Sequence, residues 1–417
     1  MRKNKILIIS YYWPPSGGSG VQRWLNFSNY LTKIGWDVTV LTAKNPNYPI
    51  TDKSLSGNIN KSIKQVFVPI FEPTLFFNQK KITLNTNSNG IINKFIYWIR
   101  ANLFFPDSRC FWIEKATKVA AEHITKNNID YLVTTAPPFS THIVGLNLKN
   151  KLKIKWISDF RDPWSNFFQF RLLPMSKSTI NRHKKFEIKC LQSSDLIITT
   201  APSLTKLYSH TNQNTVTITN GFESYIEGIK SKKFLIIYAG LMNNIQNPVM
   251  FWKVLSDICL ENSTFKNDLE VKMIGTFGNE IKNNSSLLSL KSKIKFLSYL
   301  EKNKLDIQLS QAHLLIVSSV NQSNNPIIPG KLFYYFSFKT KILAFEKPNN
   351  DISKILNETS SGKSFDFDNY VDLKKHIINL YDEYKLEKKY NFKNYCDKYK
   401  YSNLSKKLDL ILKSKIN

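Results

Sequence analysis

A glycine-rich turn near the start of the chain has the composition of an anion-binding loop. Residues 5–10 (KILIIS) are apolar, as in a buried strand, and run straight into YYWPPSGGSGVQRW, residues 11–24. A strand, a glycine-rich turn and a helix together present backbone N–H groups to anionic ligands in α/β proteins. We expect Gly17, Gly18 and Gly20 to adopt positive φ angles or to let a ligand approach the backbone, with an ordinary strand–helix loop as the alternative. The turn is not the dinucleotide fingerprint G-x-G-x-x-G, and no acidic residue closes the next apolar strand, which argues against NAD.

Three ionisable residues follow another apolar strand. The segment SDFRDPW, residues 158–164, contains Asp159, Arg161 and Asp162. Carboxylates in such a cluster can orient or deprotonate a hydroxyl group, and an arginine can bind phosphate. The structural alternative is an aspartate–arginine pair that ties down the loop, with Asp162-Pro163 starting a turn.

Two further strand ends carry polar residues. In TTAPPFSTH, residues 134–142, a Pro-Pro loop opens onto a predicted helix whose first turn contains His142. In TITNGF, residues 217–222, Asn220 precedes a glycine in a predicted tight turn. Because ligands of α/β sheets bind at the carboxyl ends of the strands, we expect these polar residues to lie at a ligand site.

The elements that must position these residues alternate between strand and helix, and the pattern restarts in the second half. The strands are β-branched and nearly continuous in apolarity, which is typical of a parallel sheet covered on both faces. The polar and basic segment 223–233 is the best candidate for a linker. We therefore predict an α/β protein with an N-terminal Rossmann-like domain at 1–224, a C-terminal one at 234–385, and a helical segment at 386–417 that could pack back on the N-terminal domain.

Length and composition agree with two globular domains. The chain has 417 residues, of which 42% are hydrophobic, and its apolar runs are much shorter than the ~20 residues that cross a bilayer. The first residues lead directly into a strand, so we expect no signal peptide. The 4 cysteines show no C-x-x-C spacing, which favours reduced thiols in a cytoplasmic protein over a metal or disulfide framework.

The net charge of +28 indicates an anionic partner for at least part of the surface. Nucleic acid, an anionic membrane surface and a polyanionic small substrate are the three possibilities. No zinc finger, RNP aromatic pattern or basic region with heptads occurs, so we expect no nucleic acid. Many of the lysines lie in Asn/Lys/Ile-rich segments, and part of the excess is expected to be ordinary solvated surface.

The motifs above, together with PGKLFYY at residues 329–335, resemble the motif set of bacterial GT-B glycosyltransferases. More narrowly, they resemble the glycosyltransferase family 4-like proteins of cell-surface polysaccharide clusters, and the match runs in order from Lys5 to about Ala344. The resemblance implies two Rossmann-like domains whose parallel sheets face an interdomain cleft. It also implies retaining transfer of a sugar from a nucleotide-sugar, bound mainly by the C-terminal domain, to a saccharide or lipid-linked acceptor. Enzymes of this kind usually need no metal, and the nucleotide-sugar is a substrate, so no cofactor is expected.

The resemblance also suggests roles for individual residues. Backbone N–H groups, helix N-termini and Lys331 would stabilise the departing nucleotide diphosphate. The residues expected to line the reaction centre are Asp159, Arg161, Asp162 and His142. The residues expected to bind the nucleotide-sugar are Gly17, Gly18, Ser19, Asn220, Gly240, Gly330, Lys331 and Tyr334.

Two departures from the family pattern keep other functions open. Tyr334 stands where relatives usually have a ribose-binding glutamate, and Pro326 stands where a paired glutamate is common. The loop at residues 239–248 contains no arginine or lysine, although relatives generally place a phosphate-binding cation there. A catalytically degenerate binding or assembly protein of the same fold is therefore one alternative, and a nucleotide-sugar epimerase is another.

A helix predicted around residues 95–105 could lie on a membrane surface. It is amphipathic, contains Trp98 and is flanked by Lys94 and Arg100. Such a helix can rest on an anionic leaflet, although a core helix is the alternative. We expect a cytoplasmic protein that associates peripherally with the inner face of the cell membrane.

Overall fold

The structure of the protein is a computed structural model that describes residues 2–72, 91–166, 173–283, 287, 289–321, 326–347, 350–387 and 394–415. The chain divides into two compact units, each described here by itself. The first unit comprises Met1–Thr219 and Leu404–Asn417, and the second comprises Asn220–Asn403.

The first unit contains a sheet of 7 parallel strands in the order β3-β2-β1-β4-β5-β6-β7. The strands are β1 (Lys5–Ile9), β2 (Asp37–Lys44), β3 (Lys64–Pro69), β4 (Tyr131–Ala136), β5 (Lys155–Phe160), β6 (Leu196–Thr199) and β7 (Thr215–Thr217). Ile6 pairs with Val38 on one side and with Tyr131 on the other, which places β1 at the centre. Every residue of β4 and four of the five of β1 are buried, as parallel strands between two helix layers require.

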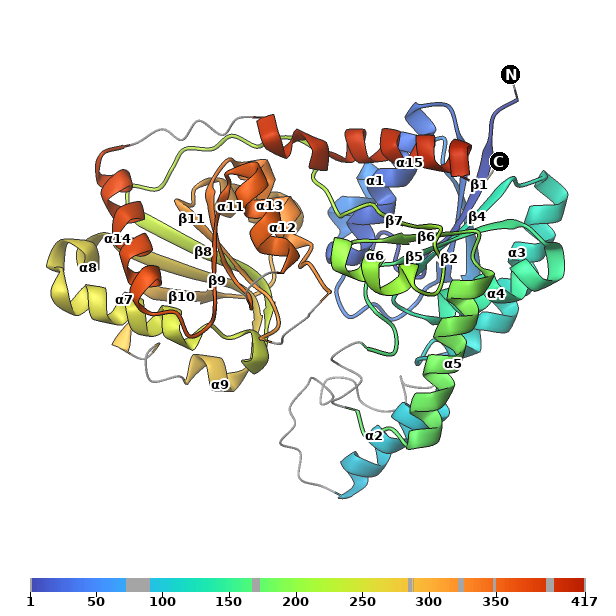
Figure 1. Ribbon diagram of the computed structural model, residues 1–417, viewed down its shortest axis with the longest axis horizontal. Coiled ribbons are helices and arrows are strands. Elements are labelled where there is room, and N and C mark those ends of the chain that lie inside the picture. Colours follow the sequence, from blue (N-terminus) through green and yellow to red (C-terminus); the bar gives the residue numbers. More distant parts are fainter. Residues whose placement is uncertain are drawn as a thin grey trace. The chain divides into compact units, whose positions relative to one another are not determined.

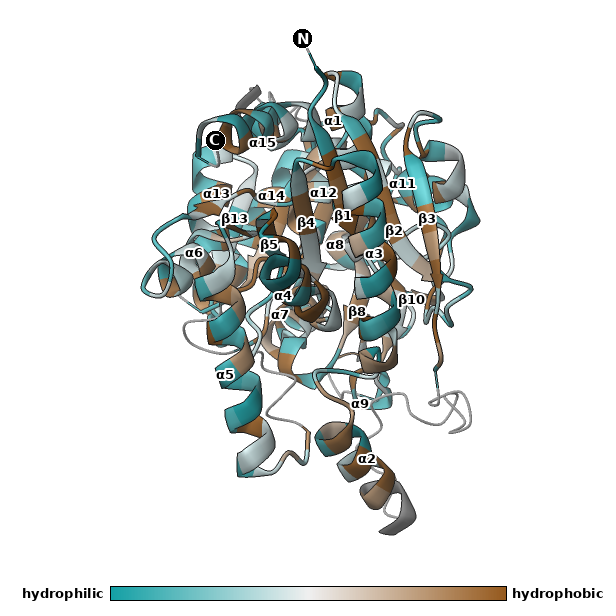
Figure 2. Cartoon of the chain, turned by 90° about the vertical axis from the view of Figure 1, so that its right-hand side faces the viewer, coloured by the Kyte–Doolittle hydropathy of each residue, from teal (hydrophilic) through white to brown (hydrophobic). Residues whose placement is uncertain are grey.

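Helices of the first unit lie on both faces of this sheet. They are α1 (Ser19–Lys33), α2 (Ile91–Leu103), α3 (Ile113–Asn127), α4 (Ser140–Leu152), α5 (Lys177–Ser193) and α6 (Pro202–Ser209). In Figure 1, α3 and α4 lie on one face of the sheet and α1 lies on the other. The α2 helix and part of α5 extend away from the sheet, as Figures 1 and 2 both show.

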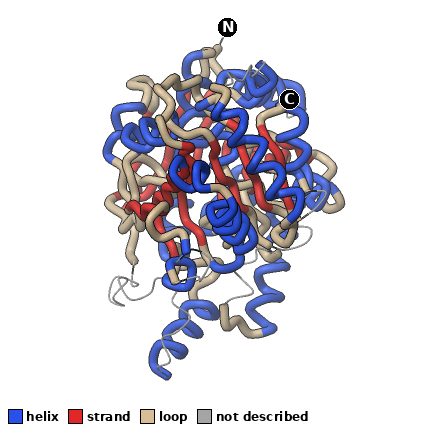
Figure 3. Tube along the Cα trace, turned by 90° about the vertical axis from the view of Figure 1, so that its left-hand side faces the viewer, coloured by secondary structure: helices blue, strands red, loops and turns tan. Residues whose placement is uncertain are grey.

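The second unit contains a sheet of 6 parallel strands in the order β10-β9-β8-β11-β12-β13. The strands are β8 (Phe234–Met242), β9 (Leu269–Phe277), β10 (Ile294–Leu297), β11 (Leu314–Ser318), β12 (Lys341–Phe345) and β13 (Gly362–Phe365). The helices are α7 (Val249–Glu261), α8 (Ser263–Asp268), α9 (Asn279–Lys282), α11 (Lys302–Ser310), α12 (Lys331–Tyr335), α13 (Asp351–Thr359) and α14 (Val371–Lys385). Helices α7, α8 and α14 cover one face of the sheet, and α11, α12 and α13 cover the other (Figures 1 and 3).

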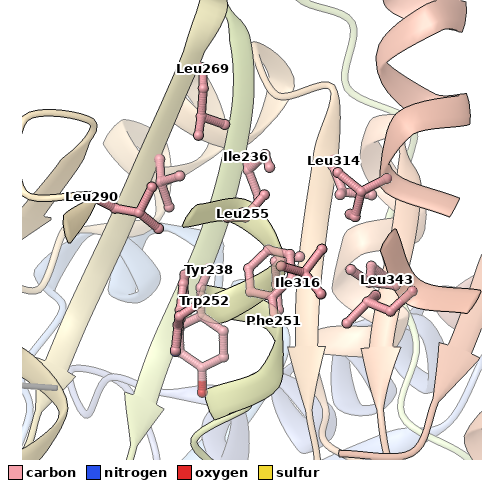
Figure 4. Packing of buried hydrophobic residues seen from close by; sticks show 14 of the residues in the cluster. Ile236, Tyr238, Phe251, Trp252, Leu255, Leu269, Leu290, Leu314, Ile316 and Leu343 are labelled. Carbon is pink, nitrogen blue, oxygen red and sulfur yellow. The ribbon is translucent and has the colours of Figure 1, made fainter. Parts of the chain in front are cut away.

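An aromatic core fixes the α7 face of the second sheet. Tyr238 on β8, Phe251 and Trp252 on α7 and Ile316 on β11 are all at most 1% exposed and belong to one cluster (Figure 4). Burying an aromatic side chain of this size contributes roughly 1.5–3 kcal/mol, so this cluster holds β8 in a fixed position. The carboxyl end of β8 therefore offers a rigid support for residues that lie beside it.

The last helix of the chain, α15 (Tyr401–Lys415), belongs to the first unit from Leu404 onward. The indole N–H of Trp36 donates a hydrogen bond of 2.7 Å to Asp409 on α15. The Lys407 ammonium donates one of 3.0 Å to the carbonyl oxygen of Thr217. Two polar contacts thus attach the end of the chain to elements formed by its first half.

The predicted fold class is confirmed, because the structure has two sheets of parallel strands within an α/β architecture. The strands predicted from apolar runs are present with their ends shifted by a few residues at most. The helices α6, α8, α9 and α13 and the edge strand β13 were not predicted. Within the described residues, no helix has both the length and the apolarity that a bilayer span requires. The 4 cysteines form no disulfide.

Candidate functional site

The glycine-rich turn joins β1 to α1, and its three glycines have different roles. Gly18 has a φ of +91°, and α1 begins at the next residue without a side-chain cap. The first N–H groups of α1 are therefore suited to an anion. The N–H of Gly17 instead donates a 2.9 Å hydrogen bond to the carbonyl oxygen of Ile50, which leaves it less suited to the expected phosphate contact.

Gly20 makes room for an arginine of the same unit. The Arg161 guanidinium donates hydrogen bonds to the carbonyl oxygens of Gly20 at 2.6 Å, of Ala136 at 3.1 Å and of Pro137. A Cβ atom on Gly20 would lie 2.6 Å from the Arg161 Nη1 atom, so a larger residue would displace the guanidinium. Arg161 thus joins the turn after β1 to the turn after β4, which favours a positioning role for it.

Asp159 lies at the end of β5 in a fully buried ion pair with Arg23 of α1. Arg23 Nη2 lies 2.7 Å from Asp159 Oδ1, and both side chains are 0% exposed. Trp24 and Thr135 donate two more hydrogen bonds to the same carboxylate, at 2.7 and 2.8 Å. Burial alone would raise the pKa of Asp159, but the Arg23 charge and these hydrogen bonds hold it below its usual value. A carboxylate so enclosed is suited to positioning the strand ends rather than to contacting an acceptor.

His142 lies in the first turn of α4 and is also fully buried. Its Nδ1 atom is 2.8 Å from the Thr134 hydroxyl, and its ring packs 4.2 Å from that of Phe160. Burial lowers the pKa of His142 to about 3, so the ring is neutral at physiological pH. This environment favours a packing role over the predicted place at the reaction centre.

Asp162 is the acidic residue of the cluster with the properties of a proton acceptor. It is half-buried, and no hydrogen bond from a described residue reaches its carboxylate. Burial raises the pKa of Asp162 to about 6, against the opposing effect of the neighbouring Arg161 charge. A carboxylate that titrates near neutrality is suited to general base catalysis at physiological pH.

The loop that carries Asp162 is anchored on α5 by Glu187, a residue that sequence reasoning missed. Its carboxylate accepts hydrogen bonds from the backbone N–H groups of Trp164 and Ser165, both at 3.1 Å. It also accepts from the Tyr208 hydroxyl at 2.6 Å and from the Ser165 hydroxyl. One feature could have drawn attention to it: Glu187 is the only acidic residue of the basic helix α5.

In the second unit, the structure brings Gly240 and Lys331 together. The Lys331 ammonium lies 3.8 Å from the centre of the Tyr238 ring and would be 2.8 Å from a Cβ atom on Gly240. Gly240 has a φ of +129°, a backbone conformation that favours glycine. No carboxylate among the described residues pairs with Lys331, and burial lowers the pKa of its ammonium to about 7. A cation at the carboxyl end of β8 is therefore left without a counterion.

The α12 helix that carries Lys331 is tied to its surroundings by two tyrosines. The N–H of Ala239 donates a 3.0 Å hydrogen bond to the Tyr335 hydroxyl, which fixes α12 against β8. The Tyr334 hydroxyl donates to Asp306 of α11, whose other oxygen lies 2.9 Å from the Lys302 ammonium. The hydrogen of the Tyr334 hydroxyl is thus already used within the protein.

The remaining predicted residues lie in the two units as follows. Ser19 is the first residue of α1, and Asn220 is the first residue of the second unit. Gly330 precedes α12 with a φ of −57°, which does not require glycine. No group of three His, Cys, Asp or Glu side chains within the described ranges could hold a metal ion.

Comparison with known proteins shows which solved structures have a similar fold. The sequence matches no known family and no curated protein. Several solved structures nevertheless match along almost the whole chain. A glycosyltransferase from Rickettsia africae ESF-5 is 13% identical, with 99% of each chain covered and a TM-score of 0.63. TarM is 12% identical, with 98% of each chain covered and a TM-score of 0.65. WaaG, a glycosyltransferase involved in lipopolysaccharide biosynthesis, is 12% identical, with 97% of this chain and 99% of WaaG covered and a TM-score of 0.59.

These neighbours are GT-B glycosyltransferases, and at such low identity the likeness concerns the fold. The protein therefore has the GT-B fold, and its activity has to be argued from the residues of the site.

Proposed function

We propose that this protein transfers a glycosyl group from a nucleotide-sugar to an acceptor hydroxyl. The observation that carries the proposal is the uncompensated Lys331 ammonium beside Gly240 in a protein of GT-B fold. A partly buried cation without a counterion is costly, and a diphosphate would supply the missing negative charge. The glycine leaves the space that the Lys331 ammonium occupies beside the backbone.

The first unit would supply the groups that act on the acceptor. We propose that Asp162 orients or accepts the proton of the acceptor hydroxyl, because its pKa of about 6 leaves it largely ionised at neutral pH. The first N–H groups of α1 would stabilise negative charge on the leaving group. Asp159 and Arg161 would hold in place the strand ends that carry Asp162 and the start of α1. In this proposal the transfer retains the anomeric configuration and requires no metal.

Binding of nucleotide-sugars tests the assignment directly. Calorimetry with UDP-, GDP-, ADP- and dTDP-sugars should identify one that binds the protein, and Lys331→Met should weaken that binding by about tenfold or more. Lys354→Met is the matched control, because Lys354 is an exposed lysine of α13 in the same unit. If the nucleotide-sugar that binds carries a labelled sugar, transfer should place the label on the acceptor. Absence of binding by every nucleotide-sugar, or unchanged affinity in Lys331→Met, would contradict the proposal.

One observation favours a binding protein without catalysis as the second candidate. The hydrogen of the Tyr334 hydroxyl is donated to Asp306, so the tyrosine offers a ligand only acceptor capacity. A protein that binds nucleotide-sugars without releasing the free nucleotide would fit this candidate. Analysis of products in the absence of acceptor would identify an epimerase.

We further propose that the protein works at an anionic membrane surface on a saccharide or lipid-linked acceptor. Phe95, Trp98 and Leu103 of α2 are 60%, 44% and 64% exposed, although they are large and apolar. Asn102 ties α2 to the basic helix α5 by accepting a 2.9 Å hydrogen bond from the Thr179 hydroxyl. Apolar side chains beside lysines and arginines are the composition of an interfacial surface. A family 4-like role in surface polysaccharide or lipopolysaccharide assembly, on the cytoplasmic side of the membrane, agrees with this surface.

A further inference from the structure

Arg109, which precedes α3 in the first unit, has one hydrogen-bond donor that the protein does not use. Its side chain is 11% exposed, and its Nε atom is buried without a partner. Its Nη1 atom donates a 2.7 Å hydrogen bond to the Ser108 hydroxyl and lies 3.4 Å from Glu72. An unused buried N–H group of a guanidinium costs free energy, so this arrangement is suited to an additional acceptor.

Glu72 does not supply that acceptor. Its Oε1 atom accepts a hydrogen bond of 3.0 Å from the Tyr11 hydroxyl, and its Oε2 atom accepts one of 2.7 Å from the N–H of Asn47. Asp107, the other nearby carboxylate, is bonded to the N–H and hydroxyl of Ser140 at 2.9 and 2.7 Å. Glu72 pairs with the Arg109 charge through Nη1, and Asp107 accepts a 2.9 Å hydrogen bond from the Arg109 backbone N–H, so it is the Nε donor of Arg109 that is left without an acceptor.

A second arginine and a tyrosine accompany Arg109. No described residue forms an ion pair with Arg100 of α2, and partial burial together with the nearby Arg109 charge lowers the pKa of Arg100. Tyr12, in the turn that follows β1, packs its ring 5.1 Å from that of Tyr11, and the Tyr11 ring lies 5.1 Å from the Arg109 guanidinium. In the described part of the chain, the Tyr12 hydroxyl has no hydrogen-bond partner. The unused Nε donor of Arg109 and the free Tyr12 hydroxyl thus belong to residues that both pack on Tyr11, and the charge of Arg100 is near enough to act on that of Arg109.

We propose that Arg100, Arg109 and Tyr12 bind a phosphate monoester carried by the acceptor. A phosphate dianion matches two guanidinium charges and has enough oxygen atoms for both of them and for a hydroxyl donor. The inference rests on the proposed glycosyl transfer for calling the ligand an acceptor, but the three residues define the anion site by themselves. None of them belongs to the residues assigned to the nucleotide-sugar.

The position of Arg100 on α2 suggests two sources for this phosphate. Trp98 lies two residues earlier on the same helix and is exposed, so a phosphate attached to a membrane lipid could reach the site. A soluble sugar phosphate offers the same group. Both sources share the monoester chemistry, and the experiment below distinguishes them.

The test measures binding of glycerol 3-phosphate by calorimetry and of vesicles by sedimentation. The vesicles are phosphatidylcholine alone or an equimolar mixture with phosphatidic acid. We expect the protein to bind glycerol 3-phosphate or the phosphatidic acid vesicles, and not glycerol. Arg100→Gln and Arg109→Gln should each weaken binding by about tenfold, and Tyr12→Phe by about threefold. Lys118→Gln, which removes an exposed charge from α3, should bind as the wild type does.

The outcomes separate this inference from the proposed function. Weaker binding of both probes by Arg100→Gln supports the site and shows that a soluble phosphate suffices, whereas weaker binding of vesicles alone assigns the phosphate to a lipid. Wild-type affinity of Arg100→Gln for both probes overturns the inference, and because Arg100 is exposed, this variant should fold even if Arg109→Gln does not. If the wild type binds phosphate through these arginines but binds no nucleotide-sugar, the proposed function fails and the anion site stands.

Discussion

Arg23 and Asp159 are 0% exposed and lie 2.7 Å apart, although 136 residues separate them in the chain. The same guanidinium donates hydrogen bonds to the carbonyl oxygens of Thr219 at 2.7 Å and Ile218 at 2.8 Å. One side chain thus joins the helix after the glycine-rich turn to the ends of two other segments. The arrangement of these segments depends on a charge that has no contact with water.

Removing one partner of this pair should destabilise the protein strongly. We expect Asp159→Ala to lower the free energy of unfolding by roughly 3–5 kcal/mol, because it leaves a buried guanidinium without its counterion. Arg23→Met combined with Asp159→Leu should cost less than Asp159→Ala, because no buried charge then remains. Unfolding by urea, followed by circular dichroism, measures both.

An exposed ion pair provides the control for that experiment. Lys64 pairs with Asp37 at 3.0 Å, and its side chain is 61% exposed. Lys64→Ala should change the free energy of unfolding by less than about 1 kcal/mol. An equal loss in Asp159→Ala and Lys64→Ala would show that burial of the Arg23–Asp159 pair has no energetic consequence.

The raised pKa of Asp162 predicts a pH-dependent effect of its removal. Between its ordinary pKa and the folded value of about 6, the folded state holds the proton more tightly, so wild-type stability falls as pH rises through this range. Asp162→Asn lacks this fall. We expect the variant to be more stable than the wild type by up to about 3 kcal/mol above pH 6, and equally stable at about pH 3.5. Urea unfolding at both pH values tests this, and a constant difference across the range would contradict it.

Lys331 should make nucleotide-sugar binding depend on pH. Burial lowers the pKa of its ammonium to about 7, and a bound diphosphate would raise it again by supplying negative charge. Binding near pH 7 should therefore take up a proton, and affinity should fall as pH rises from about 6 to about 8.5. Calorimetry in buffers of different ionisation enthalpy detects this uptake. Lys331→Met should show no proton uptake, and uptake of the same size in this variant would assign the proton to another group.

The same lysine should lower the stability of the empty protein at acidic pH. Since its pKa is depressed in the folded state, the cost of burying the ammonium is fully present below about pH 7 and disappears towards its ordinary pKa. Lys331→Met should thus stabilise the protein by up to about 5 kcal/mol at pH 6 and by much less at pH 10. Thermal unfolding at the two pH values provides the measurement.

Exposed aromatic residues of α2 should govern binding to vesicles. Phe95 and Trp98 stack with ring centres 6.5 Å apart and are both exposed. Trp98→Ala should weaken sedimentation with anionic vesicles by about fivefold or more, because a large apolar side chain leaves the interface. Leu260→Ala removes a side chain that is 81% exposed in the second unit and should have no effect. Equal effects of the two substitutions would exclude α2 as the contact surface.

The strands that could be predicted from the sequence are those whose residues are almost all buried. The residues of β1 and β4 form continuous apolar runs, because both faces of a central parallel strand are covered. The edge strand β13 escaped prediction, since its sequence GKSF has only one buried residue. Edge strands face a helix or strand on fewer sides, so they lack the pattern that identifies central ones.

The sequence predicted which strand ends carry the residues of the candidate site. It did not predict which residues form ion pairs and hydrogen bonds with them. Asp159 and Asp162 are three residues apart and look alike in the sequence, but one pairs with Arg23 while the other receives no hydrogen bond from a described residue. Their opposite pKa shifts follow from those partners. Gly20 was read as part of a ligand loop, yet the space beside it is filled by Arg161. Contacts between residues more than a hundred positions apart leave no local pattern from which to predict them.

The membership of α15 in the first unit has a consequence for how the protein is made. Leu404, Leu408 and Leu412 are at most 5% exposed, and Asp409 holds the Trp36 indole. The ribosome must therefore synthesise the entire second unit before it releases α15, which carries these residues. Until then, the apolar surface of the first unit that α15 covers remains exposed. A chaperone can bind to it during that time.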